Sequence, residues 1–197
     1  KNDEIMICSG GSSQVPMIIV SRPENDYSLV VNVPSYESAS DAAAYLRSRG
    51  HSKISRIFVM SPKAEYCAGL KYLCAFMNAE SLAMPEPTSV MKKANEALEC
   101  AESARIVYEP MFKVSRSEYT FSSPDIKSSV KNDDLLLEYS HFQSKISIRI
   151  SDLPEGGAEI SIENHSGNKP LELRLERSLR KNIIFVESDG KGCRLKK

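Results

Sequence analysis

The chain has 197 residues, and its 26 lysines and arginines balance 26 aspartates and glutamates, so that the formal net charge is zero. A hydrophobic content of 41% without net charge excludes an intrinsically disordered chain and disfavours a strongly basic nucleic-acid binder. Five cysteines are too few for a disulfide scaffold, and the longest apolar runs, of about six residues, are too short to cross a bilayer.

The first hundred residues predict short strands and helices in alternation. Three short runs rich in β-branched residues are typical of strands: residues 4–8, 15–20 and 27–33. Residues 38–49 predict a helix, because Ser38 or Ser40 can cap its N-terminus and Gly50 follows its end. The apolar run 54–60 indicates a strand that is buried on both faces.

A second helix is predicted to begin at Ser61 and Pro62, with the serine as N-cap and the proline in the first helical position. Apolar side chains recur along it at helical spacing: Tyr66, Leu70, Leu73 and Met77. Because much of its circumference is apolar, we expect this helix to be central to the core. Thr88 can cap a third helix that runs to residue 104.

The pattern changes after residue 104 to that of an antiparallel sheet. Two short strands are expected around Pro110: residues 105–109 and 111–115. Residues 122–134 are polar and aperiodic, which predicts a mobile loop or linker. Three later stretches alternate apolar and polar side chains: residues 146–150, 159–163 and 171–175. This alternation indicates strands with one face on a core and the other in water, and a last strand is expected at residues 182–186.

Together these patterns predict an α+β fold. An N-terminal mixed α/β region with three helices and short strands (residues 1–104) precedes a C-terminal antiparallel β-meander (residues 105–197). A boundary near residue 104 or within residues 122–134 would divide the chain into two domains. The alternative is one continuous α+β domain in which the meander packs against the helices.

The cysteines favour a reducing compartment, and hence a cytoplasmic protein over a secreted one. Cys67 and Cys74 lie seven residues apart on one predicted helix, which separates them by roughly 10 Å along its axis, whereas a disulfide needs Cα atoms within about 7 Å. The sequon Asn164-His165-Ser166 is the opposing signal. A chain that begins at Lys1 instead of methionine indicates a processed or trimmed product.

Neither a metal site nor a cofactor site is predicted. His51, His141 and His165 lie far apart in the sequence, and no Cys or His pair has the close spacing of a zinc site. The glycine-rich residues 9–13 lead into a further strand, so that no helix N-terminus would face a bound phosphate.

A cysteine nucleophile is the enzymatic alternative that the residues offer. Cys67 would lie in the second turn of the helix that begins at Pro62, where the helix dipole lowers the pKa of a thiol. His51 or His141 could serve as its base. The apolar neighbours of Cys67 are nevertheless typical of a structural cysteine, so the sequence favours a protein that is not an enzyme.

The end of the chain is locally basic. The residues concerned are Arg177, Arg180, Lys181, Lys191, Arg194, Lys196 and Lys197. An acidic membrane surface or a nucleic acid could bind such a segment. Acidic residues such as Glu187 and Asp189 are interleaved with these bases, and no aromatic side chains accompany them, which favours a solvated sheet face with a frayed tail.

One order of elements extends over residues 27–84: a strand ending at Pro34, a helix, a strand, and the turn Tyr66-Cys67-Ala68-Gly69. In this order the chain resembles the ClpP/crotonase-like group of serine peptidases and related hydrolases, whose members carry their nucleophilic serine near that turn. Ser35-Tyr36 stands where the group has Gly-Gly, and no serine stands between Ala68 and Gly69. The resemblance implies a hydrolase with its site near the helix that begins at Pro62, or a relative that has lost the activity.

The residues as a whole predict a non-catalytic protein-binding module that acts as an adaptor, assembly factor or structural subunit. No catalytic constellation emerges from their spacing, whereas a β-meander with a polar loop offers strand edges and loops to other proteins. The expected partners are other proteins or further copies of the chain.

Overall fold

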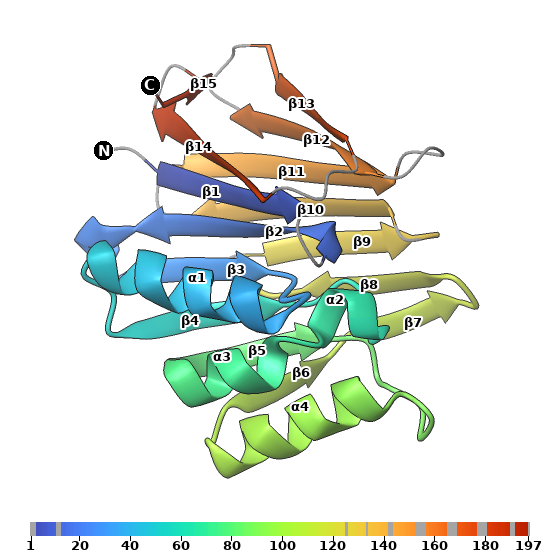
Figure 1. Cartoon of the computed structure of the whole chain (residues 1–197). Helices are drawn as coiled ribbons and strands as arrows, with labels where there is room; N and C mark the ends of the chain where they lie inside the picture. The colour runs from blue at the N-terminus through green and yellow to red at the C-terminus, as the bar shows by residue number, and fades with distance from the viewer. Residues whose placement is uncertain are drawn as a thin grey trace.

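The computed structural model describes residues 3–10, 13–124, 126–132, 134–141, 144–152, 157–164, 169–176, 181–189 and 192–196. Among these residues, helices, an eight-stranded sheet and a seven-stranded sheet form three successive layers (Figure 1). We call the middle sheet, which has the helices on one face, sheet A, and the outer sheet on its other face sheet B. The two halves of the predicted α+β fold, a mixed region and an antiparallel sheet, are both present.

Sheet A contains parallel and antiparallel strands. In spatial order these are β15 (Gly192–Leu195), β14 (Asn182–Asp189), β1 (Asp3–Gly10), β2 (Ser13–Arg22), β3 (Tyr27–Val31), β4 (Lys53–Phe58), β5 (Asn78–Met84) and β6 (Val107–Pro110). Neighbouring strands from β15 to β3 are antiparallel, and those from β3 to β6 are parallel. The parallel strands need crossover connections, and helices supply them.

The helices cover one face of sheet A (Figure 1). They are α1 (Tyr36–Ser48), α2 (Ala64–Cys67), α3 (Leu70–Phe76) and α4 (Lys92–Ser103), and a short 3₁₀ helix, η1 (Pro23–Asn25), precedes β3. Helix α1 begins two residues earlier than predicted, because the Ser35 hydroxyl, and not Ser38 or Ser40, caps it by accepting a hydrogen bond from the Ser38 amide at 3.1 Å. No helix in the described part of the chain is long and apolar enough to cross a membrane.

The second predicted helix is interrupted, which corrects the expectation of a continuous helix from Pro62. The chain leaving β3 passes directly over it: the Gly69 amide donates to the Val33 carbonyl at 2.8 Å, and the Val33 amide donates to the Tyr66 carbonyl at 2.9 Å. These contacts divert hydrogen bonds from the helix, and the close approach at residue 69 requires a glycine, since a Cβ atom there would lie 2.0 Å from the Ser35 carbonyl oxygen.

Strand β5 is absent from the sequence predictions. Its residues follow Met77, which continues the helical spacing of α3, so the apolar pattern does not show where the helix ends. The strand is defined by its parallel pairing with β4 on one side and β6 on the other. Its second half is fully buried, as expected for a strand inside a covered sheet.

Sheet B is an antiparallel meander in which each strand pairs with the next along the chain. Its strands, in spatial order, are β13 (Leu171–Glu176), β12 (Gly157–Asn164), β11 (Ser144–Asp152), β10 (Asp134–His141), β9 (Ile126–Lys131), β8 (Glu118–Ser122) and β7 (Phe112–Ser115). The predicted loop at residues 122–134 is wrong, because it contains β9. Ile126, Ser128 and Val130 alternate inward on this strand, and the buried serine hides the period of two.

The strands after residue 104 are divided between the two sheets. Strand β6 pairs in parallel with β5, and β14 returns to sheet A beside β1, with Ile5 opposite Val186. Aromatic pairs connect the sheets: the Tyr27 and Tyr139 rings stack with centroids 5.1 Å apart. The inner face of sheet B is therefore buried against sheet A, as the period-two alternation predicted.

Candidate functional site

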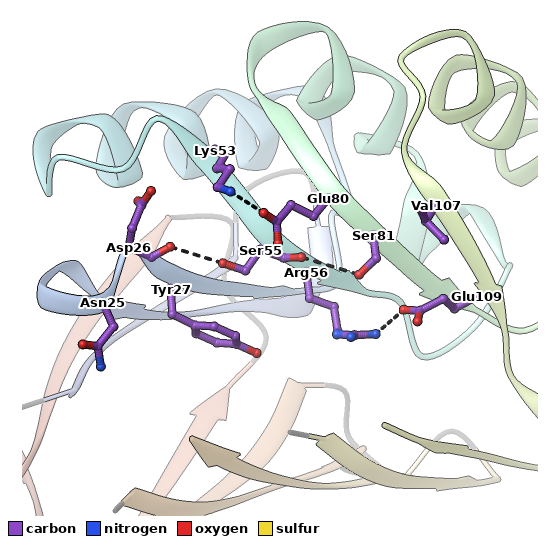
Figure 2. Close-up of a pocket in the computed structure, with 10 residues that line it drawn as sticks. All are labelled: Asn25, Asp26, Tyr27, Lys53, Ser55, Arg56, Glu80, Ser81, Val107 and Glu109. Carbon is purple, nitrogen blue, oxygen red and sulfur yellow. Dashed lines mark hydrogen bonds and ion pairs between the residues drawn. The ribbon is translucent and has the colours of Figure 1, made fainter. Parts of the chain in front are cut away.

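A groove of about 480 Å³ lies at the amino ends of strands β3 to β6 (Figure 2). Five of the residues that line it are charged, namely Asp26, Lys53, Arg56, Glu80 and Glu109. On β4 and β5 the polar and charged side chains stand within the first four residues, and both strands end in apolar residues. We call this cavity the amino-end groove. Its size is within the range of about 300–1,000 Å³ that is usual for ligand pockets, but its lining is much more polar than theirs.

Lys53 and Glu80 form an ion pair at the mouth of the groove. Both side chains are half exposed, and the Glu80 carboxylate raises the pKa of the Lys53 ammonium group by accepting a hydrogen bond from it and by its charge. Exposed pairs of this kind contribute little to folding, since water and salt screen them. Either side chain can therefore leave its partner and pair with a charged ligand at a small cost in folding stability.

Arg56 and Glu109 form a second ion pair deeper in the groove, where Arg56 is mostly buried. The two residues belong to β4 and β6, so the pair extends past β5. The Arg56 guanidinium also lies over the Phe121 ring of sheet B, 5.3 Å from its centroid, in cation–π geometry. Arg56 thus connects the edge strand β6 of sheet A to sheet B, and its side chain forms part of the wall of the groove.

Behind the groove, Ser21, His51 and Asp26 form a hydrogen-bonded chain. His51 Nε2 and Ser21 Oγ are 2.8 Å apart, and His51 Nδ1 and Asp26 Oδ1 are 3.2 Å apart. This is the order of groups in a Ser-His-Asp triad. Ser21 and His51 are both buried, so the Ser21 hydroxyl has no access to a substrate, and the chain joins the end of β2, the turn after η1 and the segment after α1.

Two edge strands that follow each other in the sequence lie next to the groove. Within the residues that the structure describes, β6 is one of the two terminal strands of sheet A, and β7 is one of the two terminal strands of sheet B. Val107, Phe112 and Val114 on these strands are 61%, 73% and 53% exposed. We call these two strands with their three exposed apolar side chains the β6–β7 edge. Val107 belongs to the groove as well.

The structure separates the predicted nucleophile from its predicted base. Cys67 lies after the carboxyl end of β4 and His51 before its amino end, and a six-residue strand spans roughly 20 Å. Cys67 is buried, its Sγ lies 3.3 Å from the Lys63 carbonyl oxygen, and burial raises the pKa of its thiol to about 11. These properties disfavour a nucleophile. His141 ends β10 in sheet B, and its side chain lies outside the described residues.

Two of the segments that carry the ClpP/crotonase-like resemblance are in contact, since the Gly69 turn packs on the chain at Ser35.

Three residues of the basic tail are described, and each pairs with a carboxylate: Lys181 with Asp41, Arg194 with Glu187 at 3.0 Å, and Lys196 with Glu4 at 2.7 Å. Arg177, Arg180, Lys191 and Lys197 lie outside the described residues.

In the described ranges, no three His, Cys, Asp or Glu side chains come together as a metal site requires. Comparison of the chain with models of known protein families and with curated proteins gives no match.

The sequence reasoning missed every charged residue of the groove. A usable signal was present: Lys53 and Arg56 stand within the first four residues of a strand that ends in an apolar run, and Glu80-Ser81 precede an apolar run in the same way. Polar residues in a parallel strand depart from the continuous apolar run that is usual in a covered sheet, and so mark a part of the strand that is less buried. Ser21 and Asp26 had no such signal, because only the fold brings them to His51.

Proposed function

We propose that the protein is a non-catalytic protein-binding module, an adaptor, assembly factor or structural subunit, which binds an extended segment of its partner along the β6–β7 edge. The observation that carries this proposal is the exposure of Val107, Phe112 and Val114 on two terminal strands. Terminal strands are normally protected, because their free backbone groups pair with other chains. Here Pro110 and Lys113 give partial protection, while the three apolar side chains favour association.

The amino-end groove supports a preference for one kind of segment. Three carboxylates, those of Asp26, Glu80 and Glu109, face two cations, Lys53 and Arg56. The Asp26 side chain is half exposed. A segment that pairs with β6 can therefore place a lysine or arginine in the groove while its apolar side chains cover Val107 and Phe112. Main-chain hydrogen bonds would supply affinity and these side chains specificity.

The test is selection of displayed peptides of about ten residues, the length of an extended segment, against the immobilised full chain, followed by fluorescence anisotropy of the selected peptides. We expect extended sequences that combine apolar residues with lysine or arginine. Val107→Lys and Phe112→Lys should each weaken binding at least about tenfold, the effect of removing about 1.4 kcal/mol. The matched control is Val90→Lys, because Val90 is 81% exposed in the segment before α4 and belongs to neither edge strand.

Equal binding by the edge variants and the control would overturn the proposal, as would a selection that yields no binder. Self-association that the same lysine variants abolish would support the edge as an interface between copies of the chain. Analytical ultracentrifugation of the full chain measures this outcome.

A hydrolase is the second candidate, and the order of Ser21, His51 and Asp26 is the specific observation in its favour. The buried position of Ser21 is the observation against it. A fluorophosphonate probe, which labels activated serines, separates the two candidates. Labelling that Ser21→Ala abolishes would establish the hydrolase, and absence of labelling at Ser21 agrees with the binding module.

A further inference from the structure

Cys74 and Cys100 lie next to each other between two helices of the outer layer. Cys74 is on α3 and Cys100 on α4, and the Cys100 thiol donates a hydrogen bond to the Lys71 carbonyl oxygen at 3.4 Å. A helical carbonyl points toward the residues three and four positions later, so the Lys71 oxygen lies beside the side chain of Cys74. The Cys100 sulfur is therefore held against the turn of α3 that carries Cys74.

A second observation agrees with this placement. The Cys100 thiol acts directly on Cys74, since its charge and its hydrogen bond are among the causes that raise the pKa of the Cys74 thiol, after the larger effect of burial. Cys67 has a different environment, because its sulfur faces the carbonyl oxygens of Pro62 and Lys63. Both Cys74 and Cys100 are free thiols in the structure, the first buried and the second half-buried.

We propose that Cys74 and Cys100 form a reversible disulfide that ties α3 to α4 when the protein is exposed to a peroxide. The more accessible Cys100 thiol loses its proton, its thiolate attacks a peroxide oxygen, and the O–O bond breaks. The hydroxide that leaves takes up this proton to give one water, and Cys100 is left as a sulfenic acid. The Cys74 thiol then loses its proton, its thiolate attacks the Cys100 sulfur, the S–S bond forms and the S–O bond breaks. The hydroxide that leaves takes up the Cys74 proton to give a second water. Two thiols are thereby oxidised and one hydrogen peroxide is reduced to two waters.

The pKa of the Cys74 thiol, which burial raises to about 12, determines how the rate of disulfide closure depends on pH. Only the thiolate attacks sulfur, so closure of the disulfide becomes faster as the pH rises. The link would also act on the binding surface proposed above, because α4 runs directly into β6: the Ile106 amide donates to the Ala101 carbonyl at 2.9 Å, and Val107 follows. The disulfide itself does not depend on that proposed function.

The experiment uses the full chain, treated with hydrogen peroxide, blocked with an alkylating reagent and digested with trypsin without reduction. Mass spectrometry should find residues 72–92 linked to residues 94–105, and dithiothreitol should release the two peptides. Residues 64–71, which carry Cys67, should be found alkylated only after unfolding and never linked. Cys100→Ser should abolish the linked species, and Cys67→Ser, the control, should retain it.

The wild-type digest alone decides the inference, so a variant that fails to fold does not weaken the test. Two alkylated peptides after peroxide treatment would overturn it, and so would a disulfide that joins either cysteine to Cys8, Cys67 or Cys193 instead. A linked species whose formation rate rises between pH 7 and pH 9 would support attack by thiolates.

Discussion

Arg56 of β4 reaches past β5 to pair with Glu109 of the edge strand β6, and its guanidinium rests on the Phe121 ring of sheet B. A single side chain thus holds together the edge of one sheet, the interior of the groove and the face of the other sheet. This relationship explains how an edge strand of four residues stays in register beside a groove that contains several charges.

Glu109→Gln should destabilise the protein by about 1–3 kcal/mol, because it leaves the mostly buried Arg56 charge without its carboxylate. Urea unfolding monitored by circular dichroism measures the change. The matched control is Glu80→Gln, which removes the half-exposed partner of Lys53 and should cost less than about 1 kcal/mol. Equal losses for the two variants would show that Arg56 does not depend on Glu109.

Gly69→Ala should be among the most damaging single substitutions in the chain. Its Cβ atom would lie 2.0 Å from the Ser35 carbonyl oxygen, so the backbone of either segment has to move, and we expect a loss of at least about 3 kcal/mol or no soluble protein. Gly50→Ala is the comparison, since nothing lies within 4 Å of its Cβ position and only the φ of +86° opposes it. That variant should lose about 1 kcal/mol in thermal or urea unfolding.

His51→Ala should destabilise the protein by about 2–4 kcal/mol, because it opens a cavity and leaves the buried Ser21 hydroxyl without its hydrogen-bond partner. Asp26→Asn should cost less than about 1 kcal/mol, since the Asp26 side chain is half exposed and an amide oxygen can still accept from His51. Unfolding free energies of the two variants check the ranking. If His51→Ala is as stable as the wild type, the chain of three residues does not hold its segments together.

Stability should fall at alkaline pH. Burial raises the pKa of the Cys67 thiol from 9.0 to about 11, so the unfolded chain loses this proton at lower pH than the folded chain does. The stabilisation is complete below pH 9 and is lost as the pH rises from 9 to about 11. Urea unfolding of the wild type at pH 7, 8, 9 and 10 measures the slope.

Cys67→Ala is the control for this pH dependence. It should be less stable than the wild type at pH 7, since it shortens a buried side chain, but should show a shallower decline above pH 9. Cys74 contributes in the same direction, because its thiol pKa is raised to about 12, so part of the decline should persist. A decline that is identical in the variant would remove Cys67 as its cause.

Local patterns were sufficient for much of the architecture. Alternation at Ile146, Ile148 and Ile150 predicted strands with one buried face, and all three side chains are buried against sheet A. Helix α1 was also predicted, within two residues at its start and one at its end. The prediction of a continuous helix from Pro62 was wrong, because the interruption at Gly69 depends on a backbone contact with residues more than thirty positions earlier.

The candidate site could hardly be predicted. His51 was singled out as a base for Cys67, yet the fold places it with Ser21 and Asp26, which come from two other segments. Arg56 and Glu109 are 53 positions apart, and the sequence around either residue does not indicate that the two form an ion pair. Contacts at such separations follow from sheet order, which hydrophobic period does not encode.

The sequence by itself determined the α+β class, the antiparallel meander and the neutral, evenly charged composition, because period, capping and composition are local properties that each segment carries alone. Only the tertiary structure decided that β14 returns to pair with β1, that β6 and β7 become neighbouring edges, and that Cys100 comes to lie beside Cys74. These features depend on which buried surfaces meet, and many segments of equal hydrophobicity could satisfy the same local pattern.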